Sequence, residues 1–541
     1  MSIVEAPLIY HTAPDGRSWY ELGLYSADTL GRRIERNVAA WPDTTLLYLS
    51  KTRGYRTTLG AAVAESQRIA SAFLDLGVKR GERIAVMLPS WHECLMCYLA
   101  GLHAGFIIVP MVTIFGVREV SFIMKNCNAR VLVCPGVWKG KDFRPIAHEM
   151  LDAGLADKVV MVDDDVIDPR FESWTDFAAR GKAPAEHGPN RPDDVCFILY
   201  TSGTTADPKG ARHTHNTLGA EWESDCYTGE DHPVGLNMMP AGHTAGLLAM
   251  VRPFFTGEEA YVMDEWDRDV AVEAIATYKV TRSGGTPFHL AGMIESADAK
   301  HLSLASLQTY IIGATNVTPA LVEAGLERGA KSCRCYGSTE HPTISAAKTA
   351  DPDRQRAFTD GRLLRGITVR LVDDDGKDVA PGEEGEIWSN GPELIVGYTD
   401  PVKNADSFVD NIWFKTGDVG RLDKDGYLSI TDRKKDIIIR GGENISSREV
   451  EEALFQHPAV SEVAVVPLPD KVMGEKVLAF IVLNDGAKSF TVADALTYFQ
   501  QIGMAKQKTP ERVEIIGEMP RTPIGKIRKQ DLKAIAKKFV A

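Results

Sequence analysis

The stretch Val195-Cys-Phe-Ile-Leu-Tyr-Thr-Ser-Gly-Thr-Thr-Ala-Asp-Pro-Lys-Gly210 runs from an apolar segment into a polar loop that ends at a lysine. Residues 195–199 have the length and apolarity of a buried strand. Gly203 allows a turn that points backbone N–H groups at an anion, and Lys209 adds a mobile positive charge. Further donors are the hydroxyls of Thr201, Ser202, Thr204 and Thr205. The pattern predicts a strand that delivers a phosphate-binding loop without Walker spacing, against the alternative of an ordinary polar turn.

Size and composition set the broad class. A chain of 541 residues is too long for one compact core, so we expect more than one domain. The net charge of -13 argues against a nucleic-acid partner or an anionic-membrane binder. No apolar run approaches the ~20 residues that span a bilayer, and the first residues lack the pattern of a secretion signal. We therefore expect a cytoplasmic protein with no transmembrane segment and with reduced cysteines.

Around the loop, helical and strand patterns alternate. Residues 58–76 place apolar side chains at helical intervals and end before Gly77, and residues 83–88 form an apolar strand pattern. Further expected strands cover residues 106–110, 129–134, 235–239, 259–263, 279–282 and 309–312, with helices over 91–103 and 117–126. Strands that alternate with helices favour parallel α/β layers.

The pattern changes from residue 367. Short strands expected over residues 367–372, 385–389 and 394–398 are separated by Asp, Gly and Pro turns, which predicts a small β-barrel-like subdomain. A charged break at residues 432–436 precedes a helix that Ser446 or Ser447 can cap, strands over 463–467 and 477–483, and a helix over 492–499. The predicted fold class is α/β. A large N-terminal domain of layered α/β subdomains (residues 1–433) precedes a small α+β C-terminal domain (residues 434–541).

Two cysteine pairs have spacings that need an explanation. Cys94 and Cys97 lie in an apolar stretch with the length of a buried helix. Cys333 and Cys335 lack the spacing of a zinc knuckle, and no matching His or Cys pair follows them. We expect all four to be core side chains.

The ordered series of polar motifs resembles that of the adenylate-forming superfamily, which includes acyl-CoA ligases, aryl-CoA ligases, peptide-synthetase adenylation domains and luciferases. The loop resembles the phosphate-binding signature, apart from Ala206, where the superfamily usually has Gly. Tyr336-Gly-Ser-Thr-Glu340 resembles the core motif, and Pro520-Arg-Thr-Pro-Ile-Gly-Lys-Ile527 resembles the C-terminal lysine motif. The resemblance covers nearly the whole chain and implies an AMP-forming acid–thiol ligase that uses ATP, Mg²⁺ and coenzyme A.

The resemblance also implies a role for individual residues. The nucleotide would be held by Thr201, Ser202, Gly203, Thr204, Thr205, Lys209, Gly313, Ala314, Thr315, Tyr336, Gly337, Asp418 and Arg433. Glu340 and Thr204 would bind Mg²⁺, a hard cation that prefers oxygen ligands. The other catalytic residues would be Thr339 as a donor to the α-phosphate, His243 as a shield between acid and ATP, and Lys526 as a compact charge.

A moving C-terminal domain is implied by the same resemblance. Lys435 would be the hinge, and Gly441, Gly442 and Asn444 would line the tunnel for the pantetheine thiol, where a bulky Cβ would obstruct. Rotation about the hinge would withdraw Lys526 and bring the tunnel residues to the acid.

The acid is less closely specified. Residues 240–244 include no acidic side chain that could pair with a substrate ammonium, which favours an acid without an α-amine. The residues of the phosphate loop, together with His213-Thr-His-Asn216, resemble those of the cyclohexanecarboxylate–CoA ligase branch. This resemblance implies an alicyclic or medium-chain acid, with aryl acids as the alternative. No carrier domain follows Lys526, so we expect free coenzyme A as acceptor and a monomer or homodimer. A stand-alone enzyme that loads a carrier protein and a non-catalytic acyl or nucleotide binder are the rival hypotheses.

Overall fold

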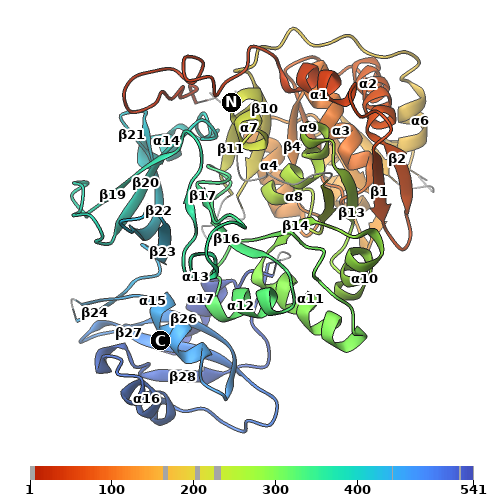
Figure 1. Cartoon of the computed structure of the whole chain (residues 1–541). Coiled ribbons are helices and arrows are strands. Elements are labelled where there is room, and N and C mark those ends of the chain that lie inside the picture. The colour runs from red at the N-terminus through yellow and green to blue at the C-terminus, as the bar shows by residue number, and fades with distance from the viewer. Residues whose placement is uncertain are drawn as a thin grey trace.

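The computed structural model describes residues 6–162, 168–201, 208–224, 233–441, 443–522 and 525–539. Two large sheets and a smaller antiparallel sheet form the N-terminal part, and a C-terminal α+β unit lies at one end of it (Figure 1). None of the helices in the described ranges is long and apolar enough to cross a bilayer.

The phosphate loop belongs to a seven-stranded sheet. Its strands in spatial order are β11 (Gly210–Thr214), β10 (Val195–Tyr200), β4 (Ile107–Pro110), β3 (Arg83–Val86), β5 (Val131–Pro135), β8 (Lys158–Val162) and β9 (Phe171–Ser173). All these pairs are parallel except the antiparallel β10–β11 pair. The accompanying helices are α2 (Leu59–Asp75), α3 (His92–Ala104), α4 (Val117–Cys127), α5 (Arg144–Asp152) and α6 (Trp174–Ala179), and the short hairpin β6 (Val137–Trp138)–β7 (Lys141–Asp142) precedes α5. The near-continuous burial of β3, β5 and β10 fits a sheet covered on both faces.

A nine-stranded sheet packs beside it. Its order is β18 (Arg362–Leu363), β17 (Ser345–Ala346), β16 (Ser332–Tyr336), β15 (Thr309–Ile312), β14 (Arg282–Gly285), β12 (Val234–Asn237), β13 (Glu259–Met263), β1 (Thr45–Leu49) and β2 (Tyr55–Thr58). The accompanying helices are α1 (Leu30–Val38), α7 (His215–Trp222), α8 (Thr244–Val251), α9 (Pro253–Thr256), α10 (Arg268–Tyr278), α11 (Pro287–Lys300), α12 (Pro319–Glu327) and α13 (Asp353–Phe358). Strands β12 to β16 are parallel, so their carboxyl ends share one edge.

The strand predicted over residues 279–282 is wrong. Helix α10 continues to Tyr278, and Lys279 adopts the left-handed conformation, with φ of 55°, that ends it. Val280 is buried in the core, and the strand begins only at Arg282. Val280 therefore belongs to the turn that joins helix α10 to strand β14.

The third sheet is antiparallel and contains β19 (Thr368–Val372), β20 (Gly385–Asn390), β22 (Trp413–Leu422) and β21 (Phe408–Val409), with β23 (Leu428–Arg433) paired to β22 and with α14 (Pro401–Ser407) before β21. The strand predicted over residues 394–398 is wrong. Gly397 has a φ of +96°, which breaks an extended run. Instead, the Ile395 N–H donates to the Glu340 carbonyl at 2.9 Å, and the Val396 N–H donates to the Arg212 carbonyl at 3.0 Å. This irregular segment joins two parts of the candidate site.

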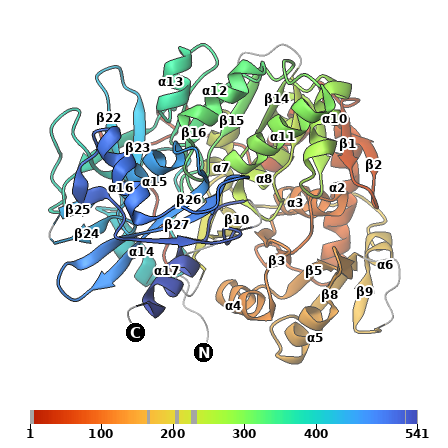
Figure 2. The ribbon, with the colours of Figure 1, turned by 90° about the horizontal axis from the view of Figure 1, so that it is seen from below.

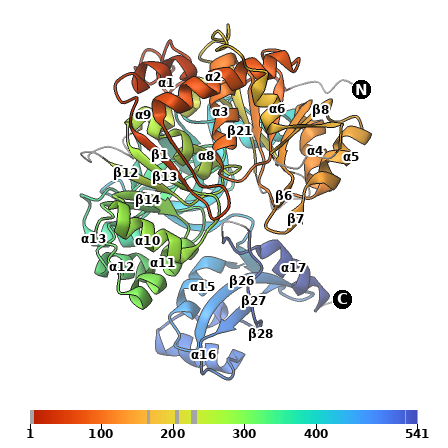
Figure 3. The same cartoon turned by 90° about the vertical axis from the view of Figure 1, so that its right-hand side faces the viewer.

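The C-terminal unit is a mixed sheet with helices. Its strands are β25 (Glu443–Ile445), β24 (Ile438–Arg440), β27 (Gly474–Leu483) and β26 (Val460–Asp470), with β28 (Arg512–Ile515) parallel to β27, and its helices are α15 (Ser447–Phe455), α16 (Val492–Gln501) and α17 (Lys529–Lys538), with a 3₁₀ turn at Lys506–Lys508. Ser446 caps α15, because its side chain accepts from the Glu449 N–H, and this confirms one of the two predicted caps. Figures 2 and 3 show the unit against one end of the N-terminal part. The domain boundary at residues 433 and 434 stays a prediction.

The two predicted core cysteine pairs lie inside the protein. Cys94 and Cys97 are buried within α3, and burial raises the pKa of Cys94 to about 12. Cys333 is buried and Cys335 is half-buried on β16, and all four thiols are free. Thiols so strongly held in the neutral form serve as core side chains rather than nucleophiles.

Candidate functional site

Tyr336, Asp418 and Arg433 meet where β16, β22 and β23 end or pair. Asp418 and Arg433 are direct partners in the β22–β23 register, and the Arg433 Nε lies 2.9 Å from Asp418 Oδ1. The Tyr336 hydroxyl donates to Asp418 Oδ2 at 2.8 Å. Burial, followed by the Asp418 charge, raises the pKa of Tyr336, and the Asp418 charge raises the pKa of Arg433. Each carboxylate oxygen keeps a further lone pair, so this buried acid can still accept hydrogen bonds from a diol.

Glu340 is joined to the phosphate loop through an aromatic ring. The Tyr398 hydroxyl donates to Glu340 Oε1 at 2.7 Å, and the Lys209 Nζ lies 5.1 Å from the centroid of the Tyr398 ring. Thr201 and Lys209 form the neck of the loop, because the Thr201 N–H donates to the Lys209 carbonyl at 3.1 Å. The predicted residues Ser202, Gly203, Thr204 and Thr205 lie outside the described residues.

Tyr398 is a residue that the sequence analysis missed. It lies at the end of the strand that the sequence predicts over residues 394–398. In the structure the chain turns at Gly397, and the Tyr398 hydroxyl donates to Glu340. Burial and the Glu340 carboxylate both raise the pKa of Tyr398, so the hydroxyl stays a donor at neutral pH. In the sequence, the only sign of this role was a Gly-Tyr pair at the end of the apolar run over residues 394–398.

Thr339 lies between two other predicted segments. Its hydroxyl is 3.3 Å from the Thr244 hydroxyl, and its carbonyl accepts from His213 Nε2 at 2.8 Å. Gly337 precedes it in a tight turn in which a Cβ would lie 1.9 Å from the Pro342 carbonyl oxygen, so only glycine fits there. His213 was quoted within a motif but was not predicted as a site residue. Its ring positions the backbone that presents Thr339.

His243 begins α8 and is neutral at pH 7. Its Nδ1 accepts from the Ala245 N–H at 3.4 Å, which makes it the N-cap of that helix. Burial, and then the charge of Lys526, lower the pKa of His243 to about 4. Among the described residues no carboxylate contributes to this shift. Among the described residues, Lys526 is thus the one charged side chain that acts on this ring.

Gly313, Ala314 and Thr315 follow β15 at the edge where β14 and β16 also end. The Gly313 N–H donates to the Gly285 carbonyl at 3.2 Å, and a Cβ at this position would lie 2.6 Å from the Cys335 sulfur. Ala314 is exposed and has a φ of 68°, a conformation that L-residues adopt at a cost of about 1–2 kcal/mol. The carboxyl edge of a parallel sheet is where such folds bind ligands. The strained backbone at Ala314 lies at this edge.

Lys526 reaches the same edge from the C-terminal unit. Its N–H donates to the Thr522 hydroxyl at 3.2 Å, and its carbonyl accepts from the Thr522 N–H at 2.8 Å. The preceding Gly525, at φ of +76°, packs so closely on α11 that a Cβ would lie 2.7 Å from Cβ of Phe288. Burial and the Arg433 charge lower the pKa of Lys526 to about 7, against the Asp418 charge that raises it. Lys526 thus lies among the residues predicted for ATP.

The predicted hinge residue borders the site, because the charges of Arg433 and Asp418 act on Lys435 and its own charge acts on Lys526, whereas the predicted tunnel residues lie elsewhere. The Lys435 carbonyl accepts from Lys533 Nζ at 3.0 Å, and Lys533 also pairs with Asp436 at 2.6 Å. Gly441, with φ of +59°, and Asn444 lie exposed on the β24–β25 hairpin. No contact among the described residues joins these two to Asp418 or Glu340, and Gly442 is outside the described residues. The structure therefore brings Lys526, and not the tunnel segment, to the nucleotide residues.

A cavity of about 610 Å³ borders these motifs, at Ile198, His215 and Thr399, without reaching the residues predicted for the site. It opens at the amino ends of β3, β4 and β10, and its lining includes Tyr10 and Arg83 but none of the residues predicted for the site. The convergence of side chains at the carboxyl edge, rather than cavity size, locates the candidate site. That convergence unites a diol acceptor, a hard oxygen ligand and cations, the groups that a Mg–nucleotide and an acid require.

Comparison with known proteins identifies the family. The AMP-binding enzyme family matches residues 34–399, and the AMP-binding enzyme C-terminal domain matches residues 449–526. The medium-chain fatty-acid–CoA ligase of Escherichia coli (strain K12) is 32% identical over 95% of this chain and 91% of its own length. The 3-[(3aS,4S,7aS)-7a-methyl-1,5-dioxo-octahydro-1H-inden-4-yl]propanoyl:CoA ligase of Mycobacterium tuberculosis (strain ATCC 25618 / H37Rv) is 30% identical over 94% of this chain and 99% of its own.

A solved structure agrees with these relatives. The anthranilate CoA ligase AuaEII, in complex with anthranoyl-AMP, is 25% identical with a TM-score of 0.85, over 96% of this chain and 99% of that one. The chain belongs to the AMP-binding enzyme family. It is an ATP-dependent enzyme of the acid–thiol ligase class, and the predicted superfamily and α/β fold class are confirmed.

Proposed function

We propose that this enzyme joins an alicyclic or medium-chain carboxylic acid, with no charged group besides its carboxylate, to coenzyme A with cleavage of ATP to AMP and pyrophosphate. The choice of acid is supported by the half-buried His243 before α8: residues 240–244 include no acidic side chain, and among the described residues Lys526 is the charged group that acts on the His243 ring. A substrate ammonium or second carboxylate buried there would lack a partner, at a cost of several kcal/mol. An apolar acid with one carboxylate directed at Lys526 incurs no such cost.

In the first half-reaction the acid carboxylate attacks the α-phosphorus of ATP, and pyrophosphate leaves. The protein supplies position and charge rather than covalent chemistry. Lys526 meets the negative charge shared by carboxylate and α-phosphate, and Thr339 donates to a phosphate oxygen. Asp418 accepts from the ribose hydroxyls, and Lys209 at the neck of its loop contacts the departing phosphates.

Mg²⁺ fits the donor set at Glu340. Oε1 of this carboxylate accepts from Tyr398, and no hydrogen bond from a described residue reaches Oε2. A half-buried carboxylate with one free oxygen suits a hard cation that keeps water and phosphate ligands. When bound, Mg²⁺ would neutralise phosphate charge beside Lys209. Thr204, the second proposed ligand, belongs to the part of the loop outside the described ranges.

The second half-reaction needs different surroundings for the same carbon. The thiolate of coenzyme A attacks the acyl carbonyl of the acyl-AMP, and AMP leaves with the bonding electron pair. We propose that rotation near Lys435 exchanges Lys526 for the segment containing Gly441, Gly442 and Asn444. The contacts across the boundary include polar ones, such as the Ser446 hydroxyl donating to the Thr431 carbonyl at 3.2 Å and the Lys434 ammonium 3.1 Å from the Glu386 carboxylate. Polar contacts of this kind can be exchanged for water at modest cost.

A screen of acids by coenzyme A-dependent AMP release tests the proposal. Cyclohexanecarboxylate and straight medium-chain acids should have the highest kcat/KM, and amino acids should give no AMP above background. The second candidate substrate class is an aryl acid, which the likeness to the anthranilate enzyme favours. A highest kcat/KM for benzoate or anthranilate would select that class. AMP release that requires a carrier protein and ignores coenzyme A would replace the ligase by a carrier-loading enzyme.

A further inference from the structure

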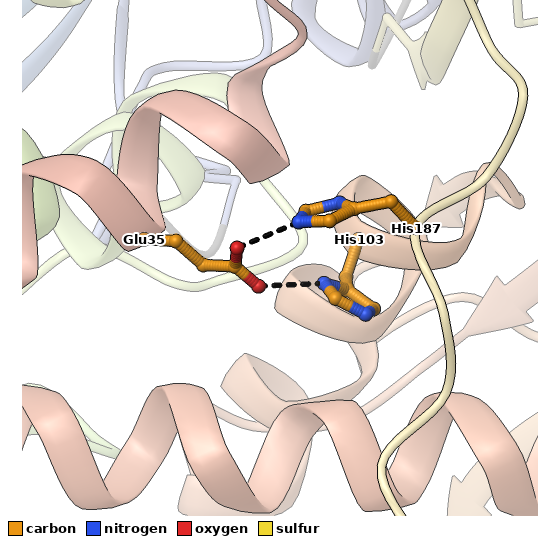
Figure 4. A group of neighbouring side chains, drawn as sticks. All are labelled: Glu35, His103 and His187. Atoms are coloured by element: carbon orange, nitrogen blue, oxygen red, sulfur yellow. Dashed lines mark hydrogen bonds and ion pairs between the residues drawn. The ribbon is translucent and has the colours of Figure 1, made fainter.

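Three titratable side chains from separate segments meet on the N-terminal part, away from the nucleotide residues. Glu35 comes from α1, His103 from the last turn of α3, and His187 from the connection between α6 and β10. Figure 4 shows the Glu35 carboxylate directed at both imidazole rings. Glu35 Oε1 is 3.2 Å from His103 Nδ1, and Oε2 is 2.6 Å from His187 Nε2. One ligand atom from each residue lies within 4.8 Å of the other two.

The hydrogen positions in this cluster follow from its partners. His103 Nε2 is 2.8 Å from the Ala185 carbonyl oxygen, which can only accept, so Nε2 carries a hydrogen. A neutral ring then presents the lone pair of Nδ1 to Glu35 Oε1, and two acceptors face each other. The His103 side chain is only 7% exposed, so solvent has little access to the ring. An electropositive atom between Nδ1 and Oε1 would remove the conflict.

We infer that Glu35, His103 and His187 form a binding site for a divalent transition-metal ion, best suited to Zn²⁺. Two imidazole nitrogens and a carboxylate are a set of three protein ligands that zinc accepts, with water in the fourth position. Tetrahedral bonds of about 2.0–2.1 Å place neighbouring ligand atoms about 3.3 Å apart. The 3.2 Å separation at His103 meets this condition, and the 2.6 Å separation at His187 needs a small side-chain rotation.

Neighbouring groups hold the proposed metal ligands in their orientations. The Ala185 carbonyl orients His103 from the far side of its ring, and Gln67 Nε2 donates to Glu35 Oε1 at 2.6 Å. Such partners fix the tautomer and direction of metal ligands. The positive charge of Arg80 would oppose the binding of a cation. Its guanidinium is directed to other partners, because it donates to the carbonyls of Ala104 and Glu186 at 2.6 and 3.1 Å. His187 and Glu35 are partly exposed, which gives an ion a path from solvent.

The position indicates a structural role. His103 lies just before the amino end of β4, whereas the phosphate loop follows the carboxyl end of the neighbouring strand β10. The ion would fasten the connection over residues 180–194, which leads into β10, to helices α1 and α3. Binding should therefore raise the midpoint of thermal unfolding and leave the kcat of pyrophosphate exchange within about twofold.

Zinc titration of the full-length, chelator-treated protein in excess Mg²⁺, in competition with a chromophoric zinc indicator, tests the site. We expect one Zn²⁺ per chain, with affinity reduced at least about 100-fold in Glu35→Gln and in His187→Gln. The matched control is His301→Asn, because His301 is exposed and has a φ of 55° that asparagine tolerates. This control should bind zinc like the wild type, and unchanged pyrophosphate exchange checks that all variants are folded.

Two results would overturn the inference. One is wild-type zinc binding no stronger than that of His187→Gln, which would leave the cluster as a protonated His–Glu ion pair. The other is tight binding that persists in both Glu35→Gln and His187→Gln, which would place the zinc elsewhere. A second readout is the midpoint of thermal unfolding, which zinc should raise in the wild type and in His301→Asn but not in the two ligand variants.

Discussion

The low pKa of Lys526 makes the adenylate-forming step depend on pH in a direction that can be worked out. Burial and the Arg433 charge lower its pKa from 10.5 to about 7. A lysine with a pKa of 7 is about 90% charged at pH 6 and about 10% charged at pH 8. If the ammonium form is the one that neutralises the reacting phosphate, kcat/KM for ATP in pyrophosphate exchange should fall about tenfold between these pH values. His243, also at the site, has a pKa of about 4 and titrates below this window, and the pKa values of Tyr336, Tyr398 and Arg433 are raised further above it.

Lys526→Arg is the matched variant, because an arginine keeps the charge throughout this range. Its kcat/KM should be lower than that of the wild type at pH 6, since the guanidinium is larger, but flat from pH 6 to pH 8. Using the same acid and ATP for both proteins removes the titration of the substrates from the comparison. A flat wild-type profile, or the same inflection in Lys526→Arg, would refute the assignment of the pH dependence to this ammonium group.

Four further substitutions separate the roles of individual residues. Lys526→Ala should lower pyrophosphate exchange by at least about 100-fold yet still convert supplied acyl-AMP and coenzyme A to thioester, and equal loss of both activities would contradict its restriction to the first step. Tyr398→Phe removes a hydrogen bond of about 1.5–3 kcal/mol to Glu340, so the Mg²⁺ concentration for half-maximal rate should change by about tenfold or more while KM for the acid is unaffected. Asp418→Asn leaves Arg433 without its ion-pair partner and should raise KM for ATP about tenfold, with KM for coenzyme A as the internal control. Ala206→Gly, outside the described residues, should alter KM for ATP modestly and leave the order of preferred acids unchanged.

Local sequence determined much of the fold. Apolar runs predicted β13 and β15 at their observed bounds, and a serine before an amphipathic stretch predicted the start of α15. These elements follow from side-chain period, capping and burial, which are local properties. The failures are also local in origin. Residues 279–282 contain the strand-favouring pair Val280-Thr281 and residues 394–398 are largely apolar, but a helix end at Lys279 and the glycine at 397 impose left-handed backbone that side-chain type does not report.

The sequence by itself determined the chemical class of this protein, because the order and the residues of the motifs around Lys209, Glu340, Asp418 and Lys526 resemble those of one superfamily. Only the tertiary structure decided which side chains meet. Tyr398 reaches Glu340 through an irregular segment, His213 holds the backbone of Thr339 from 126 residues away, and Lys526 enters from a different unit. The physical reason is that hydrogen bonds and charges act over a few ångströms in space, whereas sequence patterns extend over a turn or a strand.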